Sequence, residues 1–145
     1  MKDRNWRPIP VLLLAVLVML MVACGPDVSD IASAEPGDKN ADGYVDIAAQ
    51  QLVEMLETKD FTLVNVHVPY AGEIERTDLF IPFDQIEENL DQLADKDAPI
   101  ILYCRSGSMS TTAAKQLAEL GYSNVYELDG GFNAWQAAGY EMLTR

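Results

Sequence analysis

From residue 48 onwards, short apolar runs alternate with stretches in which apolar residues recur every three or four positions. Such runs are typical of buried strands, and the longer spacing is typical of helices with one apolar face. The pattern predicts strands at 61–68, 98–103 and 124–128, and helices at about 48–58, 83–93, 111–120 and 132–138. Helices that alternate with strands indicate an α/β fold built on a parallel sheet.

Proline and glycine mark the ends of these elements. Pro69 ends the first predicted strand, because proline cannot donate to a sheet ladder, and Gly121 and Gly139 are expected to stop two helices. Residues 71–82 are expected to form an irregular loop, and 129–131 a turn.

A polar, small-residue segment from Cys104 to Ser110 connects the central apolar run to the next helical pattern. Open parallel sheets bind ligands at the carboxyl ends of their strands, where Cys104 is expected to lie. Loop N–H groups and the following helix N-terminus attract anions, so we expect them to favour the Cys104 thiolate, helped by the positive charge of Arg105. The alternative is an ordinary buried cysteine.

The first 24 residues have the pattern of an export signal. Three basic residues precede the 13-residue apolar run 11–23, which is too short to span a bilayer comfortably as a helix. Residues 20–24 resemble the bacterial lipobox, with Met21 in place of the more usual Leu. This resemblance implies cleavage before Cys24 and lipidation of Cys24; an uncleaved anchor and a plain secretory signal are the alternatives.

Composition supports an acidic domain on a tether. The chain has 10 basic and 23 acidic residues, and loss of residues 1–23 would leave 7 and 22, a net charge of −15. Such acidity argues against binding to nucleic acid, and the lipid would hold the protein at the outer face of the cell membrane. We expect a signal peptide at 1–23, a flexible acidic linker at 24–43 and one domain at 44–145. With Cys24 acylated, Cys104 would be the sole thiol, which excludes an intramolecular disulfide.

The segment 38–46 copies the first nine positions of a calcium-binding loop, but Ala49 stands at the twelfth position, where a glutamate is needed. An acidic turn before the first helix is therefore the preferred interpretation. We expect no cofactor and no metal ion in the active site.

Three ordered motifs resemble the rhodanese-homology family, over about residues 47–142. They are 103–107 with the following Ser110, 120–126, and 128–140. The resemblance implies a three-layer sandwich, in which a parallel sheet is flanked by helices. It also implies a sulfurtransferase, in which Cys104 accepts sulfane sulfur as a persulfide and passes it to a thiol or cyanide. The implied substrate-binding loop comprises Arg105, Ser106, Gly107, Ser108, Met109 and Ser110.

Two departures from the family pattern bear on the substrate. Met109 stands where active members commonly have Arg, and Asn65-Val66-His67 stands where the family often has Asp-x-Arg. Both favour a donor less charged than thiosulfate, such as a polysulfide or a protein persulfide. His67, the only histidine, is either a base or donor near the sulfur or, as we prefer, a histidine of the core or rim.

The sequence leaves two other functions open. One is a non-catalytic binding or redox-sensing module, in which Cys104 carries persulfide or oxidation without turnover. The other is a cysteine phosphatase or arsenate reductase. That chemistry needs an Arg at the position of Ser110 to bind the oxyanion, and the sequence therefore disfavours it.

Overall fold

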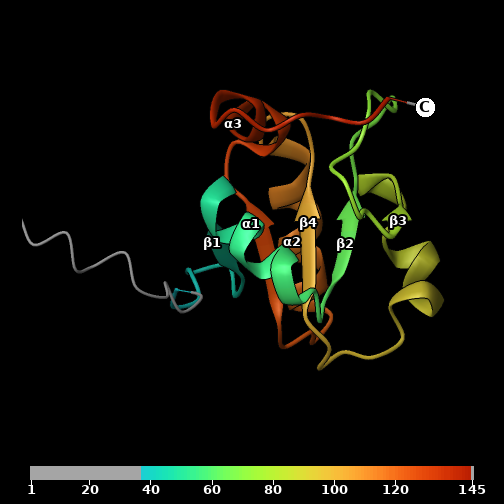
Figure 1. Ribbon diagram of the computed structural model, residues 1–145. Coiled ribbons are helices and arrows are strands. Elements are labelled where there is room, and N and C mark those ends of the chain that lie inside the picture. The colour runs from blue at the N-terminus through green and yellow to red at the C-terminus, as the bar shows by residue number, and fades with distance from the viewer. Residues whose placement is uncertain (1–36, 145) are drawn as a thin grey trace, which may run out of the picture. The chain divides into compact units, whose positions relative to one another are not determined.

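The computed structural model describes residues 37–144, which form a five-stranded parallel sheet between two helical layers (Figure 1). The predicted signal peptide, Cys24 and most of the predicted linker lie outside the described residues. Within 37–144, no helix combines the length and apolar character that crossing a bilayer requires.

The strands are β1 (Val45–Ile47), β2 (Thr62–Asn65), β3 (Leu79–Phe80), β4 (Ile100–Tyr103) and β5 (Val125–Leu128). Their order in the sheet is β1-β5-β4-β2-β3, and every neighbouring pair is parallel. This confirms the predicted α/β sandwich. The edge strands β1 and β3 were not predicted, because two or three residues are too few to show a strand period.

Each face of the sheet carries its own helical layer. The face covered by α1 (Ala49–Thr58) and α3 (Gly131–Ala137) buries Leu63, Ile101 and Leu128. The opposite face buries Val64, Leu102 and Val125 under α2 (Ser108–Glu119) and the 3₁₀ segments η1 (Phe83–Gln85) and η2 (Glu87–Leu93). Side chains alternate along a strand, so each central strand serves both layers.

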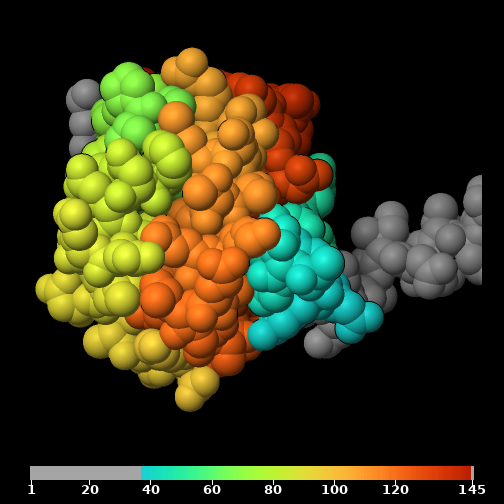
Figure 2. Space-filling model, turned by 180° about the vertical axis from the view of Figure 1, so that it is seen from behind, coloured from blue at the N-terminus to red at the C-terminus, as the bar shows by residue number. Residues whose placement is uncertain are grey.

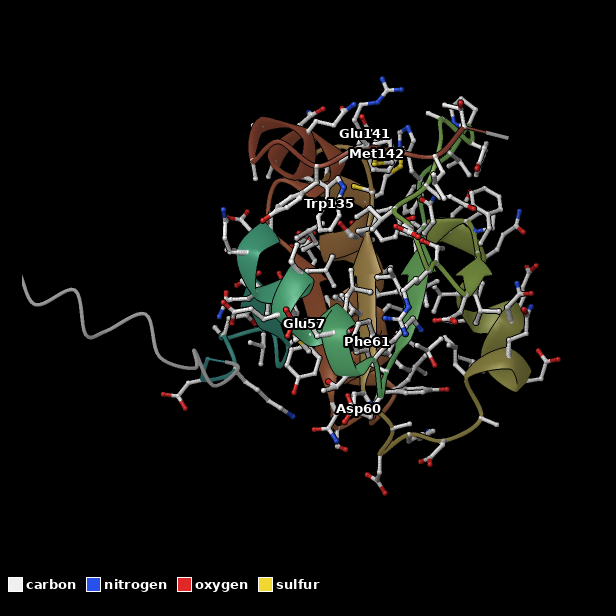
Figure 3. All side chains as sticks on the ribbon, viewed as in Figure 1. Glu57, Asp60, Phe61, Trp135, Glu141 and Met142 are labelled. Atoms are coloured by element: carbon white, nitrogen blue, oxygen red, sulfur yellow. The ribbon has the colours of Figure 1, made fainter. Side chains whose placement is uncertain are left out.

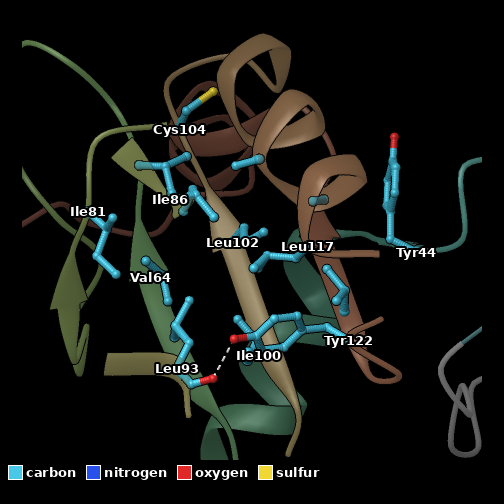
Figure 4. Packing of buried hydrophobic residues seen from close by; sticks show 14 residues of the cluster. Tyr44, Val64, Ile81, Ile86, Leu93, Ile100, Leu102, Cys104, Leu117 and Tyr122 are labelled. Atoms are coloured by element: carbon cyan, nitrogen blue, oxygen red, sulfur yellow. Dashed lines mark hydrogen bonds between the residues drawn. The ribbon is translucent and has the colours of Figure 1, made fainter. Parts of the chain in front are cut away.

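The layer under α2 ends at the cysteine. Figure 4 shows Ile100, Leu102 and Leu117 packed between β4 and α2, with Cys104 beyond them and its sulfur directed away from Leu102. Burial of one such aliphatic side chain contributes roughly 1.5–3 kcal/mol to stability. The core therefore fixes the strand end that carries Cys104.

On this face α2 (orange in Figure 2) lies between the 3₁₀ segments (yellow) and the turn at 38–46 (cyan), and polar contacts join it to both. Gln116 Nε2 donates to Glu87 Oε1 at 2.8 Å on the η2 side, and Lys115 Nζ pairs with Asp42 Oδ1 at 2.8 Å on the other. The turn at 38–46 is organised by Asn40, which accepts a hydrogen bond from the Asp42 N–H and donates to Asp46 Oδ2. Asp42 and Asp46 of this turn thus have protein partners.

The predicted helix at 83–93 was wrong in type. The segment forms the 3₁₀ segments η1 and η2 instead of an α-helix, and η2 is kinked at Asn89, which has the non-helical angles φ −121° and ψ 20°. Its side-chain amide donates to the Gln85 carbonyl at 2.8 Å, a local bond that competes with the helical ladder. Ile86 and Leu93 are nevertheless buried, as the apolar spacing predicted.

The end of the chain packs around α3. Figure 3 shows Trp135, Glu141 and Met142 close together at the α3 end, far from Phe61 near the start of β2. The Trp135 indole is buried and donates to the Glu141 carbonyl at 3.0 Å. This tryptophan therefore packs the end of α3 against the segment that follows it.

Candidate active site around Cys104

Cys104 lies directly after β4, in a short loop that leads into α2. The helix begins at Ser108, three residues earlier than predicted, so Ser108, Met109 and Ser110 form its first turn. Gly107 precedes the helix with φ +97°, a conformation that favours glycine. The N–H groups of a helix's first turn have no acceptor within the helix, and here they border the cysteine loop.

Two polar groups approach the Cys104 sulfur. The Gly107 N–H donates to Sγ at 3.2 Å, and the Ser110 hydroxyl donates to it at 3.3 Å. The side chain is only 1 % exposed, so these donors act where water does not compete. Both groups are therefore placed to hydrogen-bond a sulfur atom that carries negative charge.

A buried carboxyl group stands behind Ser110. Glu127 in β5 is 2 % exposed, and its Oε1 accepts a short hydrogen bond from the Ser110 hydroxyl. Burial raises the pKa of Glu127 to about 7; the charges of Asp46 and Asp129 act in the same direction, and the Ser110 hydrogen bond opposes them.

Sequence reasoning did not single out Glu127. The available signal was its place in a short apolar strand, where it shares a side with the buried Val125. A charged residue on the buried side of a central strand needs a partner and is a candidate for function.

The start of α3 holds the backbone of the cysteine loop from the other side. The Phe132 and Asn133 N–H groups donate to the carbonyls of Cys104 and Arg105 at 2.9 and 3.0 Å. Gly131 has φ +53°, and a Cβ placed on it would lie 2.1 Å from the Cys104 carbonyl oxygen. Only glycine permits this approach, so the predicted turn at 129–131 positions the site.

A family model described as a rhodanese-like domain matches residues 48–138. The chain belongs to the rhodanese-like family. It is 36 % identical over 98 residues to the thiosulfate sulfurtransferase GlpE of Shewanella oneidensis, covering 63 % of this chain and 92 % of that protein. It is 34 % identical over 106 residues to the thiosulfate sulfurtransferase GlpE of Pseudoalteromonas translucida, covering 68 % of this chain and 95 % of that protein.

Solved structures agree with this rhodanese-like fold. A rhodanese-like domain protein from Staphylococcus aureus matches with a TM-score of 0.58 at 27 % identity, covering 68 % of this chain and 98 % of that one. The thiosulfate sulfurtransferase of Pseudomonas aeruginosa matches with a TM-score of 0.59 at 26 % identity, covering 68 % of this chain and 19 % of that one.

The other predicted loop residues of this rhodanese-like domain face outward to different degrees. Arg105, Ser106 and Ser108 are exposed, and Met109 is half-buried against the core layer under α2. Two surface hollows lie outside the loop, one along the outer side of α2 and one beside α3. Neither hollow is lined by Cys104, which is buried beneath the exposed Arg105, Ser106 and Ser108 of the loop.

His67 lies on the α3 side of this rhodanese-like domain. Its ring packs edge-on against Phe132 with centroids 5.3 Å apart, and it is 6 % exposed. Neither ring nitrogen has a hydrogen-bond partner among the described residues. Burial lowers the pKa of His67, and the charge of Arg105 lowers it further, so the neutral form is favoured at pH 7.

Asn65, which stands where the family often has Asp, has a structural role. Its side chain is buried, donates to the Gly72 carbonyl at 2.9 Å and accepts from the His67 N–H at 3.0 Å. It therefore holds the irregular loop after β2 against the strand.

Proposed function

We propose that this rhodanese-like protein is a sulfurtransferase that carries sulfane sulfur as a persulfide on Cys104. The observation that carries the proposal is the pair of hydrogen bonds from Gly107 and Ser110 to the Cys104 sulfur, inside a loop fixed by α3. The similarity to proteins named thiosulfate sulfurtransferase supports the same reaction class.

The transfer has two steps. With thiosulfate, the Cys104 thiolate attacks the outer sulfur, the sulfur–sulfur bond of the donor breaks, and sulfite leaves with its electron pair. In the second step an acceptor thiolate or cyanide attacks the outer sulfur of the Cys104 persulfide and releases the Cys104 thiolate. The first step consumes the Cys104 thiolate and the second regenerates it, and the groups that donate to Sγ stabilise this form.

Two features of the site bear on which sulfur donor it uses: the Cys104 sulfur is buried, and few positive charges lie near it. A terminal sulfane sulfur on a thin chain, as in a polysulfide or a persulfide, can reach a buried atom more easily than a bulky anion can. Arg105 is the cation beside the cysteine, and Met109 supplies none. We therefore favour polysulfide or persulfide over thiosulfate as the efficient donor.

Mass spectrometry of the intact domain tests this function. After incubation with polysulfide, and separately with thiosulfate, we expect one added sulfur on Cys104 that is lost on addition of cyanide or a thiol. Cys104→Ser should gain none. A Cys104 that never gains sulfur from thiosulfate, polysulfide or a small persulfide would refute the proposal.

One alternative retains the fold without turnover, as a binding or sensing module. The covered sulfur and the absence of a cation at Met109 favour it. A persulfide that forms but resists both thiol and cyanide would support that module. A phosphatase is disfavoured, because the group directed at the sulfur from the sixth position is the Ser110 hydroxyl rather than a cation.

We also propose that Cys24 is lipidated and holds the domain at the extracytoplasmic face of the membrane. The basic start, the apolar run 11–23 and the lipobox-like residues 20–24 support this location. Expression in a bacterium that processes lipoproteins should place the protein in the membrane fraction and label it with radioactive palmitate. Cys24→Ala should abolish the label; a label that persists in this variant would contradict the proposal.

A further inference from the structure

We propose that Glu127 acts through the Ser110 hydroxyl to control the charge that the Cys104 sulfur can hold, and so sets the pH range of the reaction. Glu127 would be a positioning residue, since Ser110 stands between it and the sulfur. The part that concerns turnover rests on the proposed sulfur transfer, whereas the effect on sulfur ionisation does not.

The geometry places Glu127 where it can have this effect. β5 lies between β1 and β4, so Glu127 has a strand on each side, with Asp46 and Leu102 as its register partners. Its side chain is on the α2 face with Val125 and reaches the first turn of that helix. Ser110 is itself completely buried, so the contact between them is shielded from water.

The Ser110 hydroxyl has one proton and three acceptors. Its oxygen lies 3.3 Å from the Cys104 sulfur, 3.1 Å from the Gly107 carbonyl oxygen and in short contact with Glu127 Oε1. A hydroxyl donates one strong hydrogen bond at a time. The protonation state of Glu127 therefore decides which acceptor receives it.

When Glu127 is neutral, its own O–H can donate to the Ser110 oxygen, which frees the Ser110 proton for the sulfur. When Glu127 is ionised, the carboxylate is the stronger acceptor and draws that proton away. The ionised form also places a second negative charge near the sulfur, where a buried site screens it weakly. Both effects disfavour a thiolate or a persulfide anion on Cys104.

The groups around Glu127 place the ionisation of its carboxyl group near neutral pH. The charges that act on Glu127 are those of Asp46 from β1 and Asp129 at the end of β5, and both are negative. From the elements packed against Glu127, the Ser110 hydroxyl of α2 contacts its Oε1, and a Cβ added to Gly107 would lie 3.7 Å from that atom. Cys104, which follows β4, is reached through Ser110. Burial raises the pKa of Glu127 to about 7, so the carboxyl group changes state in this range.

The test compares wild type with Glu127→Gln, whose amide donates to Ser110 at every pH and carries no charge. Thiolate content of Cys104 is measured by ultraviolet absorbance from about pH 5 to about pH 9, against Cys104→Ser as the blank. We expect the thiolate of the variant to form at a pH lower by roughly one unit, the tenfold effect of one charge-assisted hydrogen bond. Glu119→Gln, an exposed carboxyl on α2, is the matched control and should follow wild type.

The initial rate of persulfide formation gives the second readout. In wild type, ionisation of Glu127 above about pH 7 should lower the fraction of Cys104 present as thiolate and hold the rate up to roughly tenfold below that of Glu127→Gln, in which this suppression is absent. Ser110→Ala should remove it as well, because it cuts the path between the two groups, and this variant serves if Glu127→Gln does not fold. Thiolate curves that coincide in wild type, Glu127→Gln and Ser110→Ala would overturn the inference. A thiolate shift without persulfide from any donor would instead uphold the inference and refute the proposed function.

Discussion

At the scale of single residues, the proposed chemistry depends on a few polar atoms around a covered sulfur. Gly107 and Ser110 donate to Sγ, and Arg105 supplies a nearby cation from the exposed rim of the loop. Met109 is the position in the first turn of α2 where a second cation would reach an anionic donor. Its half-buried side chain instead packs on the core layer under α2.

Met109→Arg should lower the apparent Michaelis constant for thiosulfate several-fold, because an added cation at the helix N-terminus binds a dianion before the chemical step. The control is Met109→Leu, which changes the shape of the side chain without adding charge. Steady-state kinetics at fixed ionic strength gives the measurement. An equal effect of both variants, or no effect of arginine, would contradict the role assigned to charge at this position.

At the scale of elements, the cysteine loop keeps its shape because N–H groups at the start of α3 donate hydrogen bonds to its backbone carbonyls. Gly131→Ala should be strongly destabilising: it combines a left-handed backbone conformation with a Cβ that would lie 2.1 Å from the Cys104 carbonyl oxygen. The conformational part alone costs roughly 1–2 kcal/mol. Gly139→Ala is the matched control, since it shares a positive φ of 91° but meets no atom within 4 Å. Equal losses in denaturant unfolding for the two variants would show that the close approach contributes nothing.

Some of these helices and strands could be predicted from the sequence, and others could not. β4, the cysteine loop and α2 were predictable because an apolar run, small polar residues and helical spacing follow one another within 98–120. The strands β1 and β3 were not, because they owe their form to sheet partners rather than to a local pattern. Glu127 was missed for a related reason: only the placement of β5 against α2 brings it to Ser110.

At the scale of the whole molecule, the buried Glu127 should make folding stability depend on pH. Its pKa is about 7 in the folded protein against 4.5 for an unburied carboxyl group, so the folded state binds this proton more tightly than the unfolded state does. The free energy of unfolding should therefore fall as pH rises from about 4.5 to about 7, by at most about 3 kcal/mol. Chemical denaturation at about pH 5 and about pH 8 should reveal this loss in wild type and a smaller one in Glu127→Gln. The same loss in both proteins would mean that this carboxyl group is not the cause.

The net negative charge of the whole chain, with 23 acidic against 10 basic residues, should also affect how fast charged donors arrive. A strongly negative surface repels anionic donors at a distance and lowers the rate at which they arrive. We expect added salt to accelerate persulfide formation from thiosulfate and to leave a neutral donor unaffected, because screening removes the repulsion. Initial rates at low and moderate ionic strength measure this; slower thiosulfate transfer in salt would show that local attraction by Arg105 outweighs the net charge.

We propose that Cys104 holds a second sulfur as a persulfide inside this loop. The most direct measurement is intact-mass spectrometry of wild type and Cys104→Ser after brief exposure to polysulfide, followed by a thiol or cyanide. We expect one added sulfur in wild type that the acceptor removes, and none in the variant. An unmodified wild type, or the same gain of mass in Cys104→Ser, would contradict it.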